Sequence, residues 1–451
     1  MQRDGGLDRR TFLRHAGLTA FAGTVGTAMP APALATGGGQ LSGSRYDFDT
    51  IHSRIGTDSS KWDAQIAKYG REQIDVGMGT ADQDFRIAPA ITRALRKRVA
   101  HENFGYLTKP ESYLESIVDW NRRRYGLEIA PETILHSDGV HPAIISTLRA
   151  FCPLGSKILL HTPGYNGFYT DIGVVGAVAE ECPLRLVNGQ YAMDFEDLER
   201  RIDHDTHAFV LCNPQNPTGN VWSRADLMTL GEICTRRRVV VLADEIHCDF
   251  VGKEHSYTPY ATLDNEAIER NSITFKSVSK SFNLSALKCA YLFSTNPDYL
   301  ARIVGPGQHR QGMNTLGIIA AETAYNECED WLDQLVEYID GTQALVESLV
   351  RTQVPSVRVV KPEGTYLSWL DASDAIDRIG AGDDPNASGA AGAETPEERF
   401  QRYLVEHARI HLIPGSSYGT GGAGHMRMNV ATSRQLIERA VSNLADALAS
   451  V

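Results

Sequence analysis

Residues 239–247 read Val-Val-Val-Leu-Ala-Asp-Glu-Ile-His, and residues 273–280 read Ile-Thr-Phe-Lys-Ser-Val-Ser-Lys. Each stretch is a short apolar run that ends in charged or hydroxyl side chains. Such runs, rich in β-branched residues and bounded by polar clusters, are typical of β-strands. The sequence therefore predicts two strands with Asp244 and Lys280 at or just beyond their carboxyl ends.

Four more runs of this kind lie between residues 130 and 300, separated by stretches of helical pattern. This alternation predicts an α/β fold in which mostly parallel strands are joined by crossover helices. Ligands bind outside the carboxyl ends of the strands in open α/β sheets, so the polar residues that follow the strands predict a site there. The six predicted strands are Thr133–His136, Lys157–His161, Ala208–Asn213, Val239–Asp244, Ile273–Ser277 and Cys289–Ser294.

The composition is that of an ordinary soluble globular protein, with 451 residues of which 42% are apolar and 22% charged. This length suggests two or three domains. The formal net charge of −12 works against binding to a phosphate backbone, so we do not expect a nucleic-acid partner. The seven cysteines form no C-x-x-C pair and no zinc-type spacing with histidine, which predicts mostly buried thiols and no metal site.

The N-terminus resembles a twin-arginine export signal. Arg9 and Arg10 precede a mildly apolar run, Ala16–Met29, and then Ala33-Leu34-Ala35. The run is shorter than the ~20 residues that span a bilayer, which favours a cleaved leader over a stable membrane anchor. We therefore expect a signal peptide over residues 1–35, a linker over 36–45, and export to the periplasm or the cell exterior.

Lys280 lies in a setting that favours covalent chemistry. Ser277 and Ser279 precede it, and a second cation, Lys288, follows. An ordinary lysine amine has a pKa of about 10.4, and nearby cations and partial desolvation lower this pKa enough to make the amine a nucleophile. The pattern predicts that Lys280 bonds to an aldehyde while the hydroxyls and Lys288 hold a phosphate group. The simpler alternative is a solvated lysine.

Two further strand ends carry candidate groups. Asn213–Gly219 reads Asn-Pro-Gln-Asn-Pro-Thr-Gly, which is a candidate binding loop or only a rigid turn. Asp244 ends a wholly apolar strand, where an unpaired carboxylate costs several kcal/mol. A protonated ring nitrogen is the partner that we propose for it.

Gly139 and Val140 follow a predicted strand and open a predicted helix, Pro142–Phe151. Their free N–H groups and the helix dipole favour an anion. At the other end of the chain, residues 425–430 alternate so that Arg427 shares one face with His425 and Asn429. A guanidinium fork matches a carboxylate, although a solvated strand arginine is the alternative.

Together these motifs resemble the class I/II aminotransferase superfamily of fold-type-I pyridoxal-phosphate (PLP) enzymes. The chain is most similar to the C–S lyase branch that includes the MalY and PatB cystathionine β-lyases. The resemblance spans nearly all of the chain from Tyr46 to Arg427. It rests on ordered motifs at fitting intervals, 28 residues from Asn216 to Asp244 and 36 from Asp244 to Lys280.

The resemblance implies a role for each candidate. Lys280 would bond to the PLP aldehyde and later move protons, Asp244 would pair with the ring nitrogen, and Asn216 would hydrogen-bond the ring 3-oxygen and contact the substrate. His247, where many relatives carry tyrosine, would support that oxygen or its neighbours, and Tyr165 would stack on the ring. The substrate α-carboxylate would bind the arginine at position 427, and the phosphate would bind the groups at 139, 140, 277, 279 and 288.

The resemblance also implies the assembly and the domains. Tyr106 matches a residue that reaches the phosphate of the neighbouring subunit, which implies a homodimer with shared active sites. A large PLP-binding domain, residues 81–330, would hold a mixed, mostly parallel sheet. A smaller α/β domain would combine residues 46–80 with residues 331–451, and a low-complexity segment, Ala372–Glu398, would form a mobile surface insertion.

The reaction is less closely specified. Several stretches favour the lyase branch, among them Phe104–Tyr106, Asp244–Phe250 and Pro362–Asp371. That branch usually has Trp-Val-Ala-Asp-Met-Asp-Phe near the pocket, whereas this chain has Gly79-Thr-Ala-Asp-Gln-Asp-Phe85, and a glycine there is more typical of aminotransferases. We expect a C–S β-lyase that releases thiol, pyruvate and ammonia. An aminotransferase, another PLP reaction and a noncatalytic binding protein remain alternatives.

Overall fold

The computed structural model describes residues 46–305, 309, 312–380 and 394–449. The chain from Tyr46 onward forms one compact unit. The predicted signal peptide and linker, residues 1–45, lie outside the described residues and stay predictions. Among the described helices, none is long and apolar enough to cross a membrane.

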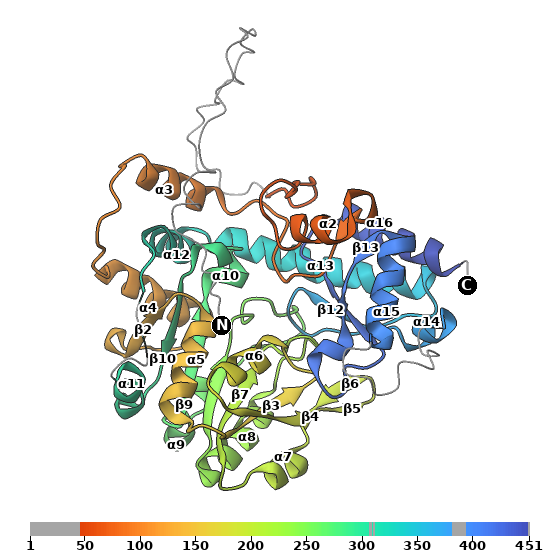
Figure 1. The fold of residues 1–451 in the computed structure, drawn as a ribbon. Coiled ribbons are helices and arrows are strands. Elements are labelled where there is room, and N and C mark those ends of the chain that lie inside the picture. The colour runs from red at the N-terminus through yellow and green to blue at the C-terminus, as the bar shows by residue number, and fades with distance from the viewer. Residues whose placement is uncertain (1–45, 306–308, 310–311, 381–393, 450–451) are drawn as a thin grey trace, which may run out of the picture. The chain divides into compact units, whose positions relative to one another are not determined.

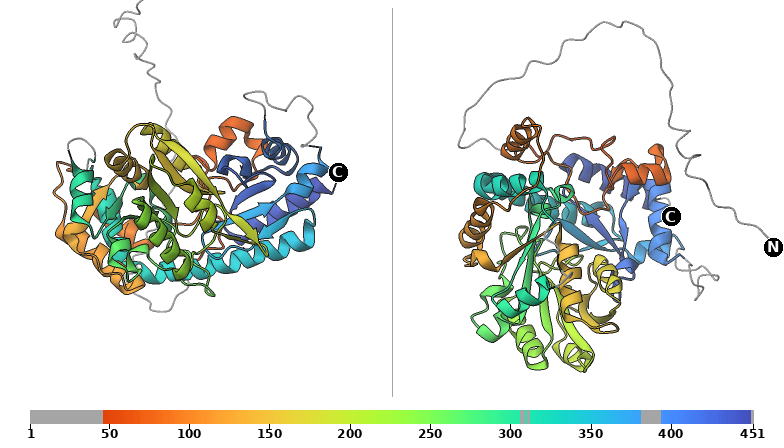
Figure 2. Two further views of the ribbon diagram at one scale, coloured as in Figure 1. Left: turned by 90° about the horizontal axis from the view of Figure 1, so that it is seen from below. Right: turned by 60° about the vertical axis from the view of Figure 1, so that its left-hand side comes forward.

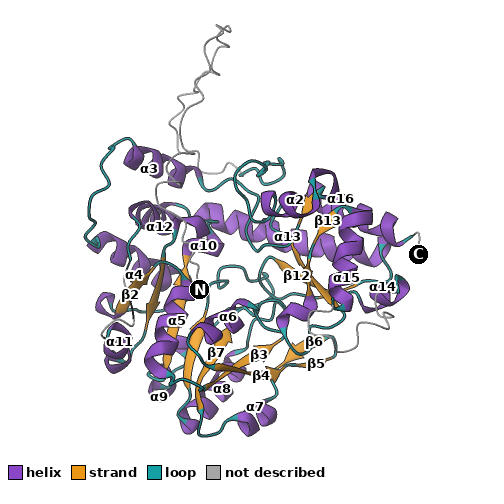
Figure 3. Ribbon diagram, viewed as in Figure 1, coloured by secondary structure: helices purple, strands orange, loops and turns teal. Residues whose placement is uncertain are grey.

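A seven-stranded sheet forms the centre of the larger part of this unit (Figures 1 and 3). β10 runs antiparallel to both of its neighbours and the remaining adjacent strands pair in parallel, which confirms the predicted mixed, mostly parallel sheet. In spatial order the strands are β2 (Ile134–Ser137), β10 (Ala290–Phe293), β9 (Ser272–Ser277), β8 (Val240–Asp244), β7 (Thr206–Cys212), β3 (Lys157–Thr162) and β4 (Val178–Pro183).

All six predicted strands are confirmed, with ends that differ by no more than two residues. The sequence analysis missed β4, which pairs only with β3 at the edge of the sheet. Its residues, Val-Ala-Glu-Glu-Cys-Pro, include two glutamates because one side of an edge strand meets solvent. The strand therefore lacks the apolar run that marks the central strands.

The central strands β7 and β8 are apolar at most positions because helices cover both faces of the sheet. In β7, Ala208 and Val210 belong to one core with the helices α5, α6 and α11, whereas Phe209 and Leu211 belong to another with α7, α8 and α9. The covering helices are α5 (Val140–Phe151), α6 (Gly167–Val174), α7 (Phe195–Arg201), α8 (Arg224–Arg237), α9 (Glu266–Glu269) and α11 (Pro297–Val304) (Figures 1 and 2).

The proline-free stretch from Leu316 to Leu349 lies in two helices, α12 (Thr315–Glu327) and α13 (Glu329–Gln353). The chain turns at Cys328, whose φ of −123° and ψ of 20° depart from helical values. α12 packs against α3 (Pro89–Val99) and α4 (Glu111–Tyr125), while α13 extends to α16 (Arg434–Leu448) (Figure 1).

A second, antiparallel sheet has the order β11 (Arg358–Val360), β12 (Leu367–Asp371), β15 (His425–Asn429) and β14 (Ile413–Pro414). Close to it, β1 (Val76–Gly77) pairs in parallel with β13 (Ile410–His411), so the segment after α2 (Asp63–Tyr69) is joined to the C-terminal part. A hairpin of β5 (Arg185–Val187) and β6 (Gln190–Ala192) and a short helix, α10 (Val278–Ser281), complete the regular elements of the larger part. The domain boundaries themselves stay predictions.

The segment predicted as an insertion, residues 372–398, is partly helical. α14 (Ser373–Arg378) begins directly after β12, and Ala375 and Ile376 on it are buried. α15 (Pro396–Tyr403) begins at a capping box formed by Thr395 and Glu398. Helices therefore form both described ends of the predicted insertion, because buried apolar side chains and a cap stabilise them there. Residues 381–393 lie outside the described residues.

The remaining short helical turns are Arg71–Gln73, Pro131–Thr133, Tyr260–Thr262, Ser285–Leu287, Leu404–Ala408 and Gly415–Tyr418. All seven cysteines are buried and unpaired, as predicted.

Candidate active site

The carboxyl ends of the central strands meet at one cavity of about 740 Å³. Asp244 is the last residue of β8, Lys280 lies in α10 just after β9, and Asn216 follows β7. The cavity brings together all of the predicted site residues except Ser277 and Tyr106: Gly139, Val140, Tyr165, Asn216, Asp244, His247, Ser279, Lys280, Lys288 and Arg427.

Ser277 does not line the cavity, and its predicted contact with a phosphate stays a prediction. Its hydroxyl donates to the Cys289 carbonyl oxygen at 2.8 Å and accepts from the Ser279 N–H at 3.0 Å. These bonds cap α10 and position Ser279, which does line the cavity. Tyr106 lies in the loop between α3 and α4 with a fully exposed side chain, so it does not reach the cavity of its own chain.

The Lys280 amine donates a hydrogen bond of 2.7 Å to the Ala81 carbonyl oxygen. Burial, assisted by the nearby positive charge of Arg427, lowers the pKa of Lys280 to about 8, although Asp82 and Asp244 oppose this shift. A larger fraction of this amine is therefore uncharged near neutral pH than of an ordinary lysine.

Asp244 presents a buried carboxylate to the cavity. Burial raises its pKa to about 6, while a hydrogen bond from the Ile246 N–H and the charges of His141 and Lys280 oppose the shift. Within the described part of the chain it has no ion-pair partner within 4.0 Å. A buried carboxylate in this position needs a cationic partner, and a protonated ring nitrogen would supply one.

His247 is buried, and its Nδ1 atom has no hydrogen-bond partner within the described residues. Burial, with the charges of Lys280 and Arg427, lowers its pKa well below the ordinary value, so the imidazole is neutral. An unpartnered nitrogen in the wall of a cavity is suited to a polar group of a ligand.

Arg427 lies on β15 and is buried. Its Nη1 donates to the Asn216 Oδ1 at 3.1 Å and its Nη2 to the Gly79 carbonyl oxygen at 2.9 Å, while Nε has no partner in the described residues. A guanidinium has five N–H donors, so donors remain for a carboxylate. The predicted alternative, a solvated strand arginine, is wrong because Arg427 is buried and bonded.

Backbone N–H groups at the start of α5 lie where the sequence predicts an anion site. Gly139 precedes this 12-residue helix, and no side chain caps its first turn. Ser279 and Lys288 lie on the same cavity wall, and Lys288 is exposed at the rim. The free N–H groups, the helix dipole and this cation favour a phosphate.

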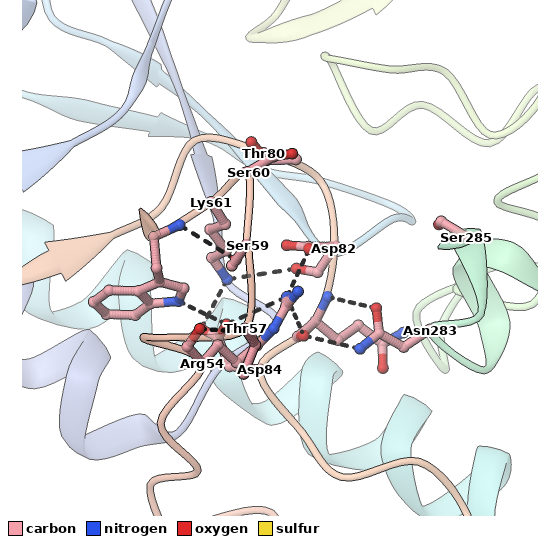
Figure 4. A network of polar contacts seen from close by, with 12 residues as sticks. Arg54, Thr57, Ser59, Ser60, Lys61, Thr80, Asp82, Asp84, Asn283 and Ser285 are labelled. Atoms are coloured by element: carbon pink, nitrogen blue, oxygen red, sulfur yellow. Dashed lines mark hydrogen bonds and ion pairs between the residues drawn. The ribbon is translucent and has the colours of Figure 1, made fainter. Parts of the chain in front are cut away.

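The loop Gly79–Phe85, whose carbonyls bond Lys280 and Arg427, is held by a polar network (Figure 4). The Lys61 amine lies 2.8 Å from the Asp84 Oδ2 atom, and both side chains are buried. An Arg54 guanidinium nitrogen lies 2.6 Å from the Asp82 Oδ2 atom. The sequence alone did not single out Lys61 or Arg54, because no local pattern reveals that they position the loop.

Gly79, where the lyase branch usually has tryptophan, faces a filled space. A Cβ atom at this position would lie 2.5 Å from the His411 Nδ1 atom and 3.0 Å from the Ile413 Cδ1 atom. His411 and Ile413 therefore occupy the room that a larger side chain at position 79 would need.

Sequence reasoning also missed cavity residues that no motif marked. His141 and Tyr418 line the cavity, the first from α5 and the second from the turn before β15. His141 comes two residues after Gly139, and Tyr418 comes three residues after Gly415. Neither belongs to a sequence pattern that predicts a binding site.

The donor set fits PLP. The carboxylate at 244 and the orphaned imidazole nitrogen at 247 suit a pyridine ring, the start of α5 suits a phosphate, and the amine at 280 suits an aldehyde. All of these groups line one cavity.

Comparisons with known proteins agree with this geometry. The family model for class I and II aminotransferases matches residues 71–444. The cystathionine β-lyase PatB of Bacillus subtilis (strain 168) is 34% identical over 407 residues, which cover 89% of this chain and all of PatB. Two crystal structures are similar to this chain, and each match covers 90% of this chain and 100% of the other one. Cystalysin from Treponema denticola, which contains PLP, has a TM-score of 0.82 at 28% identity. A PLP-bound putative aminotransferase from Clostridium difficile 630 has a TM-score of 0.81 at 33% identity.

The fold is thus that of the fold-type-I PLP enzymes, as the sequence predicted. The match covers most of the chain, and the chain belongs to the class I and II aminotransferase family.

Proposed function

We propose that this protein is a PLP-dependent C–S β-lyase, which converts a cysteine conjugate such as cystathionine into a thiol, pyruvate and ammonia. One observation carries the proposal: Lys280, Asp244 and Arg427 line a single cavity, in a chain that matches a cystathionine β-lyase over 89% of its own length. The three groups are those that amino-acid chemistry on PLP needs.

The chain's own residues would bind the substrate and the cofactor as follows. The free N–H donors of Arg427 would bind the α-carboxylate and so orient Cα toward Lys280. Asp244 would hold a proton on the pyridine nitrogen, His247 and Asn216 would bond the ring oxygen, and the start of α5 would bind the phosphate.

When bound, PLP supplies an electron sink that makes the Cα–H bond of the substrate acidic. Lys280 would take this proton with its amine, for which a pKa of about 8 is suitable near neutral pH. Because the Lys280 amine and the Asp244 carboxylate are buried, water does not compete with the substrate and the cofactor for contact with them.

An aminotransferase is the second candidate, and Gly79 is the observation that favours it, since the lyase branch usually has tryptophan there. The two reactions share the binding steps and the removal of the Cα proton. They differ in the step that follows. In the lyase the β-substituent would leave, whereas in the aminotransferase the proton would be passed to the cofactor.

Incubation of the holoenzyme with cystathionine or an S-alkyl cysteine, without a keto acid, tests the proposal. We expect catalytic release of pyruvate and thiol, loss of this activity in Lys280→Ala, and no loss in the exposed control Lys253→Ala. Turnover that requires an added keto acid would contradict the lyase and support the aminotransferase.

We also propose a homodimer with shared sites, in which Tyr106 acts on the neighbouring cavity. The exposure of Tyr106 and of Phe104 supports this assembly. Lys280 and Lys288 also line a second cavity of about 990 Å³, so the site is open on that side in the single chain. If Tyr106 acts in the partner's site, mixing Lys280→Ala subunits with Tyr106→Ala subunits restores activity, because one site of each mixed dimer is intact. Absence of recovery in confirmed mixed dimers would contradict the proposal.

The order of Arg9-Arg10, the apolar run and Ala33-Leu34-Ala35 supports export by the twin-arginine route. We propose that the mature protein acts outside the cytoplasm. Fractionation of producing cells should find the mature chain there, and an Arg9→Lys/Arg10→Lys variant should keep it in the cytoplasm. Unchanged location of this variant would contradict the route.

A further inference from the structure

Three side chains, two in the cavity wall and one behind it, form a hydrogen-bonded chain that the proposed mechanism does not use. The Asp171 Oδ2 atom lies 2.6 Å from the His141 Nδ1 atom, and the His141 Nε2 atom lies 3.1 Å from the Tyr165 hydroxyl oxygen. His141 and Tyr165 line the cavity, whereas Asp171 lies behind them, buried on α6. We call these three residues the Tyr165 relay.

The carboxylate determines which nitrogen of the imidazole carries hydrogen. An ionised Asp171 only accepts, so His141 Nδ1 donates to it and Nε2 is left to face Tyr165. When His141 is neutral, Nε2 accepts the phenolic hydrogen. When His141 is protonated, Nε2–H donates to the phenolic oxygen, and the phenolic hydrogen is free to point into the cavity.

The charges around His141 favour the protonated form. The hydrogen bond to Asp171 raises the pKa of the imidazole above its ordinary value, and the negative charges of Asp171 and Asp244 act in the same direction. Burial and the positive charge of Lys280 oppose the shift. These charges lie on α6, β8 and α10.

The backbone leaves room for this contact. Gly167 is the first residue of α6, and a Cβ atom there would lie 2.6 Å from ring atoms of both His141 and Tyr165. Any other residue would push the two rings apart. The close approach of imidazole and phenol thus depends on a glycine that no turn requires.

We infer that His141 and Asp171 are positioning residues that keep the Tyr165 hydroxyl available as a proton donor inside the cavity. The inference rests on the proposed function, because the proton acceptor is the sulfur that leaves the substrate. The thiolate takes the phenolic proton, so that an S–H bond forms and the O–H bond of Tyr165 breaks. The phenolate then takes the Nε2 proton of His141, and the imidazole, part of which is exposed, takes a proton from water.

The first test measures the relay without turnover. Histidine-selective labelling of the holoenzyme gives imidazole NMR signals, and the signal of His141 is the one missing in His141→Gln. We expect the pKa of His141 to fall by ~1–3 units in Asp171→Asn, because an adjacent opposite charge is lost. The control Tyr169→Phe removes a hydroxyl from the same helix, one that bonds Glu181, and should leave the pKa of His141 unchanged.

The second test is the pH dependence of thiol release. The alkaline limb of kcat should move to lower pH in Asp171→Asn, and it should disappear in His141→Gln, with kcat lowered ~10–100-fold and KM changed little. Tyr165→Phe keeps the ring and should lower kcat to a similar extent. Tyr169→Phe should behave as the wild type.

The outcomes separate the two proposals. An unchanged His141 pKa in Asp171→Asn, or pH profiles of both variants that superimpose on that of the wild type, overturns the relay even if the wild type is a lyase. A wild type that releases no thiol overturns the proposed function, and with it the sulfur as proton acceptor, whatever the NMR titration shows.

Discussion

The Lys280 amine donates a 2.7 Å hydrogen bond to the carbonyl oxygen of Ala81, a residue 199 positions earlier in the chain. Ala81 lies in the loop Gly79–Phe85, whose Gly79 carbonyl oxygen also accepts from Arg427. One loop therefore aligns the predicted nucleophile with the predicted carboxylate-binding group. The predictions below test the charges and contacts in this arrangement.

Capture of PLP by the cofactor-free protein should depend on pH with a half-maximal rate near pH 8, because only the uncharged Lys280 amine reacts and its pKa is about 8. The rate should fall as the pH falls. In Arg427→Met the loss of a neighbouring cation should move the midpoint to higher pH. Stopped-flow absorbance measures both, and a midpoint near 10.4 in the wild type would contradict the assigned environment.

Arg427→Lys should raise KM for the amino-acid substrate and lower kcat/KM ~10–100-fold, since a bidentate, charged hydrogen-bond pair is replaced by a single donor. The lost bonds to Asn216 and Gly79 contribute to the same effect. Steady-state kinetics on the holoenzyme measure it. If kcat falls and KM stays constant, Arg427 does not bind the substrate carboxylate.

Asp244→Asn should lower kcat ~10²–10³-fold while Lys280 still captures the cofactor, because an amide cannot keep a proton on the pyridine nitrogen. The cofactor-free variant should be more stable than the wild type at pH 7. The pKa of Asp244 in the folded state is about 6, which is above its ordinary value of about 4. The free energy of unfolding therefore falls as the pH rises from about 4 to about 6, where the buried carboxyl loses its proton. Urea midpoints at pH 4 and pH 7 test the sign, with exposed Asp264→Asn as control.

Lys61→Met should destabilise the protein by ~3–5 kcal/mol, because the carboxylate of Asp84 is left buried without its cation. A Lys61→Met/Asp84→Leu double variant should recover part of this loss. The exposed pair Arg402–Glu394 provides the control, since Arg402→Ala should change stability by less than ~1 kcal/mol. Urea unfolding measures the free energy of unfolding of each variant. Equal decreases in Lys61→Met and Arg402→Ala would show that the buried pair does not hold the loop.

Gly79→Ala should lower stability by ~1–3 kcal/mol, since its methyl group would overlap the His411 ring. In a His411→Ala background the same substitution should cost less, because the ring is absent. The difference between the two costs is the coupling energy of a double-mutant cycle. A coupling of zero would mean that His411 does not fill the space beside Gly79.

The strand ends and their chemistry followed from the sequence because the signals are local. Asn216, Asp244 and Lys280 each follow a short apolar run, and parallel strands bring their carboxyl ends to one edge of a sheet. The alternation around Arg427 likewise predicted the strand that presents it. The sequence did not predict β4, because an edge strand carries polar residues and so lacks the apolar run that marks the central strands.

Other features depend on the tertiary structure, because they join residues that are distant in sequence and carry no periodic pattern. The bond from Lys280 to Ala81, the His411 ring beside Gly79 and the position of Asp171 behind His141 are contacts of this kind. Sequence determined which chemical groups stand at the strand ends, since β-periodicity acts over a few residues. Packing of the loop, helices and second sheet determined which of these groups meet and what pKa each one has, since burial and charge proximity arise only in the folded chain.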